Sequence, residues 1–258
     1  EILIGLVGSE MCIRDRYNSL IQETAEFMYS FATYEEEHDR YVLKGAIPAQ
    51  ETLRAAETVN PPFELSYWHF AMQVAQTWRE RTRMERVPEW DVLIEKLSPL
   101  AYNDEQLYLA AETAVDTYKD IRFTSDHMAV LGAVGILPMN QLIHAGYMKN
   151  TLHWIWDNWN WDKTWGWDYP MTAMNAARMG EPEKAVSALL MDKRTNTYLV
   201  NGHNYQDGRL RIYLPGNGGL LTTVAMMCAG WDGSEGNNPG FPKDGKWNVR
   251  WEGLQPLP

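Results

Sequence analysis

Tryptophan is concentrated in one short segment of the chain, together with small polar side chains. Six of the twelve tryptophans fall between Trp154 and Trp167, and Asp and Asn residues are interspersed among them. A pyranose ring has an apolar face of C–H groups and a rim of hydroxyls, so an aromatic platform edged by carboxylates and amides suits it. The segment therefore predicts a sugar-binding cleft. The alternative is that these indole rings fill a wide hydrophobic core.

Other common site chemistries are poorly represented. The six histidines do not have the spacing of metal ligands, and His144 and His153 are nine residues apart. The glycine-rich LPGNGG at 214–219 can present backbone amides to an anion or a sugar hydroxyl. It lacks the Gly-Lys-Ser/Thr ending of a nucleotide-binding phosphate loop. The sequence therefore predicts neither a metal site nor a cofactor.

Composition narrows the class of protein. A chain of 258 residues with 45% apolar content can bury a substantial core. Its net charge of −11, without a cluster of basic residues, argues against a nucleic-acid partner. No stretch approaches the roughly 20 apolar residues that cross a bilayer. Cys12 and Cys228 lie far apart, so we expect Cys228 to be a buried free thiol, and cysteine usage leaves the cellular compartment open.

The first sixteen residues stand apart from the rest. EILIGLVGSEMCIRDR has no basic residue before its apolar stretch and no small-residue cleavage site, unlike a secretory signal. It resembles translated sequencing-adapter sequence. We expect residues 1–16 to be a non-native segment and residues 17–258 to carry the fold.

Helical periodicity dominates residues 17–258. Apolar spacing predicts helices at about 17–34, 63–83, 88–97, 126–138 and 140–156, with Asn140 as a cap, and an irregular stretch at 98–124. In the segment 167–192, Gly180 ends one helix and Pro182 begins the next, which is typical of an αα-hairpin. A loop at 195–219, a buried helix at 220–229 and a short extended segment at 246–254 follow.

These elements favour an all-α fold. Strand content is low, and no βαβ repeat is present. Helix pairs joined by long loops indicate a helical toroid or solenoid. No period near 34 residues recurs, which argues against a regular tetratricopeptide-type array.

Two long stretches carry a family resemblance. Residues 195–221, TNTYLVNGHNYQDGRLRIYLPGNGGLL, and residues 164–185, TWGWDYPMTAMNAARMGEPEKA, resemble bacterial six-hairpin glycosidases related to glycoside hydrolase family 65. IPAQE at 47–51 and NPPFELSYWHF at 60–70 fit the same group. The resemblance implies an (α/α)6 toroid preceded by a β-sandwich, with residues 17–258 as the C-terminal part of the toroid. It also implies hydrolysis or phosphorolysis of α-glucosides.

The resemblance assigns the role of general acid to Glu51. Members of the family carry this acid in a loop before a toroid helix, in a pattern resembling G-P-D-E. Here the tetrapeptide is PAQE, so Gln50 replaces the acidic neighbour. Glu57 and Glu64 are rivals, although the dipole of the following helix explains Glu64 equally well.

The resemblance also suggests where the general base lies. A serine-rich loop holds phosphate in the family phosphorylases, and the aligned stretch here ends in Asp168. A carboxylate repels phosphate and can activate water, which favours hydrolysis. Asp168 can instead be an N-cap for a helix from Tyr169. Family hydrolases can draw the base from the loop before the glycine-rich turn, where Asp207 is the second candidate.

We therefore expect an inverting glycoside hydrolase that acts on an oligosaccharide or glycoconjugate. Glu51 would protonate the glycosidic oxygen, and Asp168 or Asp207 would activate water on the opposite face of the sugar. The alternatives are a disaccharide phosphorylase of the same fold and a non-catalytic carbohydrate-binding protein. The side chains expected to bind the sugar are Trp68, Trp161, Trp165, Trp167, His203, Asn204 and Asn217.

Overall fold

The computed structural model describes residues 2–258, with side chains described from residue 13 onward except at residue 15. This part of the chain is mostly helical. Its α-helices are α1 (Ile2–Phe31), α2 (Pro62–Arg81), α3 (Pro88–Lys96), α4 (Ile121–Thr124), α5 (Ala145–Asn158), α6 (Asp168–Arg178), α7 (Pro182–Leu189) and α8 (Leu214–Ala229). The expected all-α class is confirmed.

Strands occur only as two small hairpins within the described residues. β1 (Thr33–Glu35) pairs antiparallel with β2 (Arg40–Val42), and β3 (Thr197–Tyr198) pairs antiparallel with β4 (Asn204–Tyr205). Each hairpin has two strands and shapes a loop between helices. The sheets therefore position loops and do not form a layer of the fold.

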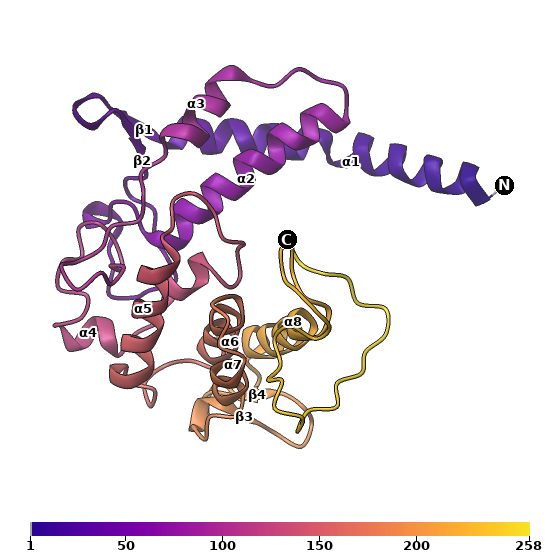
Figure 1. Ribbon diagram of the computed structural model, residues 1–258. Helices are drawn as coiled ribbons and strands as arrows, with labels where there is room; N and C mark the ends of the chain where they lie inside the picture. Colours follow the sequence, from indigo (N-terminus) through magenta and orange to yellow (C-terminus); the bar gives the residue numbers. More distant parts are fainter. Residues whose placement is uncertain (1) are drawn as a thin grey trace.

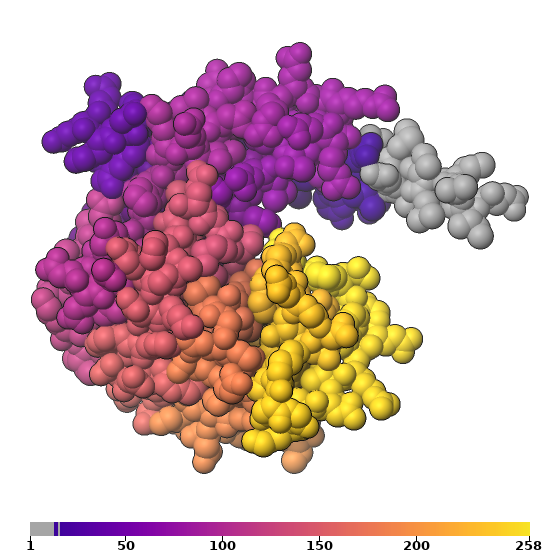
Figure 2. Space-filling model, in the orientation of Figure 1, coloured from indigo at the N-terminus to yellow at the C-terminus, as the bar shows by residue number. Residues whose placement is uncertain are grey.

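The helices lie along an open arc. Figure 1 shows α1, α2 and α3 grouped at one end, α6, α7 and α8 grouped at the other, and α5 between them. The space-filling view is open on one side, between the N-terminal helices and the C-terminal segment (Figure 2). A curved row of helices is compatible with part of a toroid, and closure into a ring stays a prediction.

Helix α6 is the centre of the C-terminal group. Every residue from 168 to 177 is buried, and α6 packs against both α7 and α8. Gly180 has φ +75° and ends the helix, and Pro182 lies in the first turn of α7. The predicted αα-hairpin is thereby confirmed.

One predicted helix is wrong. Residues 126–138 form only a short 3-10 helix at Ala129–Ala133. Gly135 has φ +152°, and a Cβ there would lie 2.8 Å from the backbone nitrogen of Asn175. At Gly135 the chain packs closely against α6 and turns with a positive φ. A continuous α-helix cannot adopt that backbone conformation.

Two boundaries also differ from the expectation. Asn140 accepts a hydrogen bond from the N–H of Leu142 in a turn, and α5 begins later, at Ala145. The glycine-rich 214–219 segment forms the first turns of α8 and not a loop. Glycine lowers helix propensity, but packing against α6 supplies the stability that the sequence alone does not show.

The remaining expectations concern the termini and cysteine. The backbone of α1 is helical from Ile2, and the non-native origin of residues 1–16 stays a prediction. The extended segment expected at 246–254 contains no regular strand. Cys228 is a buried free thiol, as expected, whereas the Cys12 side chain lies outside the described residues. Among the described helices, none has the length and apolar character needed to span a bilayer.

Candidate active site

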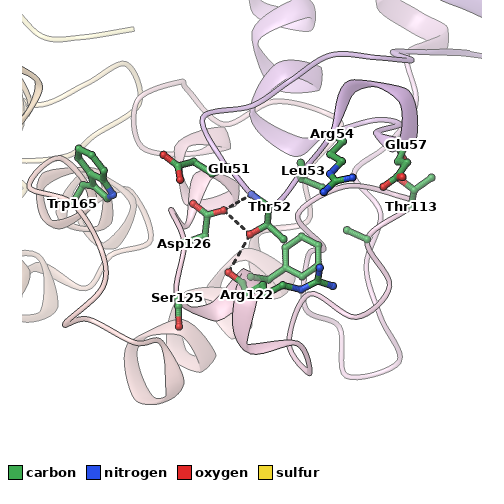
Figure 3. A pocket seen from close by; sticks show the side chains of 12 residues that line it. Glu51, Thr52, Leu53, Arg54, Glu57, Thr113, Arg122, Ser125, Asp126 and Trp165 are labelled. Carbon is green, nitrogen blue, oxygen red and sulfur yellow. Dashed lines mark hydrogen bonds between the residues drawn. The ribbon is translucent and has the colours of Figure 1, made fainter.

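A cavity of about 640 Å³ opens where three loops meet. The loops are the one before α2, the one around α4 and the tryptophan-rich turn before α6. Figure 3 shows the side chains around this cavity. The lining residues are Glu51, Thr52, Leu53, Arg54, Glu57, Thr113, Ala114, Arg122, Phe123, Ser125, Asp126 and Trp165.

Glu51 and Trp165 lie at one end of this cavity. The exposed Glu51 side chain extends from its loop toward the half-buried ring of Trp165 (Figure 3). A carboxyl group beside an indole is the combination that a sugar-cleaving site needs, because the ring holds the sugar and the carboxyl group exchanges a proton. The structure thus brings together two residues that were predicted for separate reasons.

Asp126 holds the loop that carries Glu51. Its Oδ2 accepts hydrogen bonds from the backbone N–H and the hydroxyl of Thr52, both at 2.7 Å. Its Oδ1 accepts the N–H of His127 at 2.7 Å. With three donors on its oxygens, Asp126 is an anchor for the residue that follows Glu51.

Neither Asp126 nor His127 was identified from the sequence. They are the first two residues of the predicted 126–138 helix, which does not form, and helical periodicity gives their side chains no functional role. The one available clue was the adjacent acid and imidazole in SDH at 125–127. That clue is weak, because an adjacent acid and imidazole indicate a functional site only when a third functional group lies opposite them in the fold.

Asp168 is completely buried at the start of α6. Its exposed fraction is 0%, and it does not line the cavity. Oδ2 accepts the backbone N–H of Trp165 at 2.8 Å and lies 2.9 Å from Nδ1 of His127, whereas Oδ1 has no partner. Asp168 is the first residue of α6, so the reading as an N-cap is wrong, and the N-cap is Trp167.

In the buried Asp168–His127 pair, the pKa values of both groups are shifted. Burial raises the pKa of the Asp168 carboxyl, and His127 opposes that rise. Burial lowers the pKa of His127, but Asp168 raises it, and Asp126 and Glu51 add to that rise. The net pKa of His127 lies above its ordinary value. Each group therefore affects the pKa of the other.

Trp165 and Trp167 surround the His127 ring. Nε1 of Trp167 donates to Nδ1 of His127 at 2.9 Å, with the two rings nearly perpendicular. The Trp165 ring lies 5.8 Å from His127 and 5.5 Å from Tyr213. These two predicted sugar-binding rings thus lie at the site, one lining the cavity and the other supporting the imidazole.

Trp161 and Trp68 lie elsewhere. Trp161 is 8% exposed and stacks on Tyr169 in the core. Nε1 of Trp68 donates to the carbonyl of Met28, between α1 and α2. Neither ring lines the cavity, and for these two rings the structure shows core and interface packing.

The predicted polar residues of the 201–219 segment hold that segment together. Asn204 is fully buried; its backbone N–H donates to Oδ1 of Asn217, and Nδ2 of Asn217 donates to the carbonyl of Gly202. Nδ1 of His203 is buried without a partner. None of these side chains lines the cavity.

Asp207 is engaged in a tight turn. Its Oδ1 accepts the backbone N–H groups of Arg209 and Leu210 at 2.7 and 2.8 Å. Those amides hold the pKa of Asp207 below its ordinary value. Asp207 does not line the cavity, so the structure gives it a turn-forming role and does not bring it to Glu51.

The segment around Asn204 nevertheless contacts the site directly. The backbone N–H of Gly166 donates to Oε1 of Gln206 at 2.6 Å. A Cβ on Gly166 would lie 1.8 Å from Oδ1 of Asn204, and a Cβ on Gly216 would lie 2.4 Å from the same atom. The tryptophan-rich turn, the 204–206 loop and the start of α8 therefore form one packed unit beside the cavity.

The two rival glutamates are in different places. Glu57 lines the cavity from the same loop as Glu51. Glu64 lies in the first turn of α2, where burial raises its pKa to about 7 and its Oε2 has no partner. Glu64 has the pKa of a general acid but no place on the cavity wall, so Glu51 has the better access to a substrate.

No protein-family model matches the chain. No curated protein matches it either. The resemblance to six-hairpin glycosidases therefore stays a prediction. Among the side chains that the structure describes, no group of three His, Cys, Asp or Glu residues is arranged to hold a metal ion.

Proposed function

We propose that this protein is an inverting glycoside hydrolase of the six-hairpin type, with Glu51 as the general acid. The supporting observation is that Glu51 and Trp165, far apart in the sequence, line one cavity. A cavity of about 640 Å³ is within the size range of small-ligand sites. The sequence predicts sugar chemistry for each of these side chains without reference to the position of the other.

The reaction uses two proton transfers. A sugar ring stacks on Trp165, and the Glu51 carboxyl group donates its proton to the glycosidic oxygen as the bond to the anomeric carbon breaks. Water attacks the anomeric carbon from the opposite face and loses a proton to a general base, a role in which Asp168 takes part. The products are a free sugar of inverted configuration and the released alcohol.

Phosphorolysis is the second candidate. Arg54 and Arg122 both line the cavity, and guanidinium groups bind phosphate well. Arg122 is already engaged by Asp120, and the carboxylates of Glu51, Glu57 and Asp126 line the same cavity and repel an anion. We therefore rank hydrolysis first.

The first prediction concerns Glu51→Gln. The substitution keeps the size of the side chain and removes its proton donor, so kcat/KM should fall by about 10²- to 10⁴-fold. Hydrolysis of α-linked disaccharides and aryl α-glucosides is measured with and without inorganic phosphate, and proton NMR identifies the anomer first released. Glu37→Gln, on an exposed turn, is the matched control and should keep full activity.

Each outcome of this assay discriminates between functions. Phosphate-dependent cleavage supports a phosphorylase and rejects hydrolysis. Release of the retained anomer rejects an inverting mechanism. Saturable sugar binding without turnover in the unsubstituted protein rejects catalysis and supports a carbohydrate-binding role.

A further inference from the structure

Asp168 cannot meet water in the cavity by itself. Its carboxyl group has no exposed surface and lies behind the cavity wall. A general base must reach the proton it removes, either directly or through one intervening group. The group that lies against Asp168 is the His127 ring, with Nδ1 at 2.9 Å from Oδ2.

Nδ1 of His127 has one hydrogen-bond partner for its protonated form and another for its unprotonated form. Nδ1 can donate a proton to Asp168, or it can accept one from Nε1 of Trp167, also at 2.9 Å. It cannot do both, because an imidazole nitrogen either carries a proton or offers a lone pair. When Nδ1 donates to Asp168, the lone pair of the neutral ring is on Nε2.

Nε2 is the ring nitrogen without a fixed partner, although His127 is only 7% exposed and is not itself among the residues that line the cavity. It makes no hydrogen bond with other described side chains or backbone, whereas Nδ1 has two close partners. The ring contacts Asp168 and lies 5.8 Å from the ring of Trp165, which lines the cavity. The carboxylates that raise the pKa of His127 belong to Asp168 in α6, to the preceding residue Asp126 and to Glu51. Tyr213, before α8, packs against Trp165 and is close enough for the charge of Asp168 to raise its pKa.

From this geometry we propose that His127 is the general base of the hydrolase and that Asp168 acts through it. This inference rests on the proposed function and specifies how its second proton transfer occurs. Nε2 takes a proton from water, and the water oxygen bonds to the anomeric carbon. The glycosidic C–O bond breaks, and its oxygen takes the proton of Glu51. Asp168 orients the ring and stabilises the imidazolium that forms.

The second prediction is the pH profile of His127 and Asp168 variants. The base must be unprotonated, so kcat/KM of the unsubstituted enzyme should fall as the pH drops through the pKa of His127. His127→Gln should lower kcat by about 10²- to 10⁴-fold with little change in KM and should abolish this acidic limb. Asp168→Asn removes the charge that raises the pKa of His127, so the limb should move to lower pH.

Azide separates catalysis by His127 from a structural role. Azide needs no base to attack the anomeric carbon, so it should restore cleavage in His127→Ala and give a glycosyl azide of inverted configuration. A ring that only supports the fold would not be replaced in this way. The matched control is His153→Gln, because His153 forms a comparable pair with Glu181 on the surface and should leave the profile unchanged.

A measurement without substrate keeps the test independent of activity. The titration of His127 is followed by NMR in the unsubstituted protein, in Asp168→Asn and in Trp167→Phe. We expect the midpoint to fall in Asp168→Asn and to rise in Trp167→Phe, because the Trp167 N–H can bond only to the neutral tautomer whose lone pair is on Nδ1 and so stabilises that neutral form. An unmoved midpoint in Asp168→Asn, or an acidic limb that persists in His127→Gln, overturns the inference while the hydrolase assignment stands. An unsubstituted protein that cleaves no glycoside overturns both.

Discussion

At the scale of single residues, function depends on which side chain can reach the cavity. Glu51 and Trp165 line it, whereas Asp168 is close by but fully buried. Asp126 accepts two hydrogen bonds from Thr52 and thereby holds the residue after Glu51. Some of these residues therefore line the cavity and others hold its wall in place, and the sequence alone does not distinguish the two roles.

The third prediction concerns Trp165→Ala. The substitution removes the only tryptophan ring found on the described cavity wall, so sugar binding should weaken by about tenfold, with a smaller effect on kcat. Isothermal titration calorimetry and KM both report the loss. Trp247→Ala, at an exposed ring in the C-terminal segment, is the control, and equal losses in the two variants would contradict the assignment.

At the scale of elements, the site depends on how tightly the tryptophan-rich turn packs on the 204–206 loop. Gly166 donates to Gln206 and approaches Asn204 without room for a side chain. Asn204 in turn donates to the carbonyls of Thr195 and Thr197. The turn that carries Trp165 is therefore held in place by residues that follow α7 in the chain.

The fourth prediction is that Gly166→Ala destabilises the fold. A Cβ at this position would lie 1.8 Å from Oδ1 of Asn204, so one of the two loops must move. We expect a loss of about 1–3 kcal/mol in the free energy of unfolding, measured by urea denaturation. Gly208→Ala has no atom within 4 Å of the new Cβ and should change stability little. Comparable losses in the two variants would show that the close packing at Gly166 is unimportant.

At the scale of the whole molecule, the helices form an arc, and several polar side chains are buried within it. Glu64, at the start of α2, is the clearest case, because burial raises its pKa to about 7 and Oε2 has no partner. A carboxyl group with a raised folded-state pKa favours folding while it is protonated. That contribution is full below its ordinary pKa of 4.5 and is lost as the pH rises through about 7.

The fifth prediction follows from this linkage. The free energy of unfolding should decline between about pH 4.5 and 7, and Glu64→Gln should flatten the decline. At pH 8 the variant should be more stable than the unsubstituted protein, because it buries no charge. Chemical denaturation across this pH range measures both effects, with Glu37→Gln as the exposed control. A slope that persists in Glu64→Gln would assign the pH dependence to another group.

The sequence by itself determined the local features of this protein. Apolar periodicity located α2 and α3, Gly180 and Pro182 defined the α6–α7 hairpin, and aromatic clustering located the turn before α6. Periodicity, capping and turn chemistry act between near neighbours, so they can be read along the chain.

Only the tertiary structure decided which side chains meet. His127 contacts Asp168 and Asp126 binds Thr52 because a predicted helix gives way to a turn that lies against α6. Tertiary packing also buries Trp161 and Asn204, which the sequence predicts to bind the sugar. Contacts between distant segments depend on how helix faces pack and how loops close, and no local pattern encodes those outcomes.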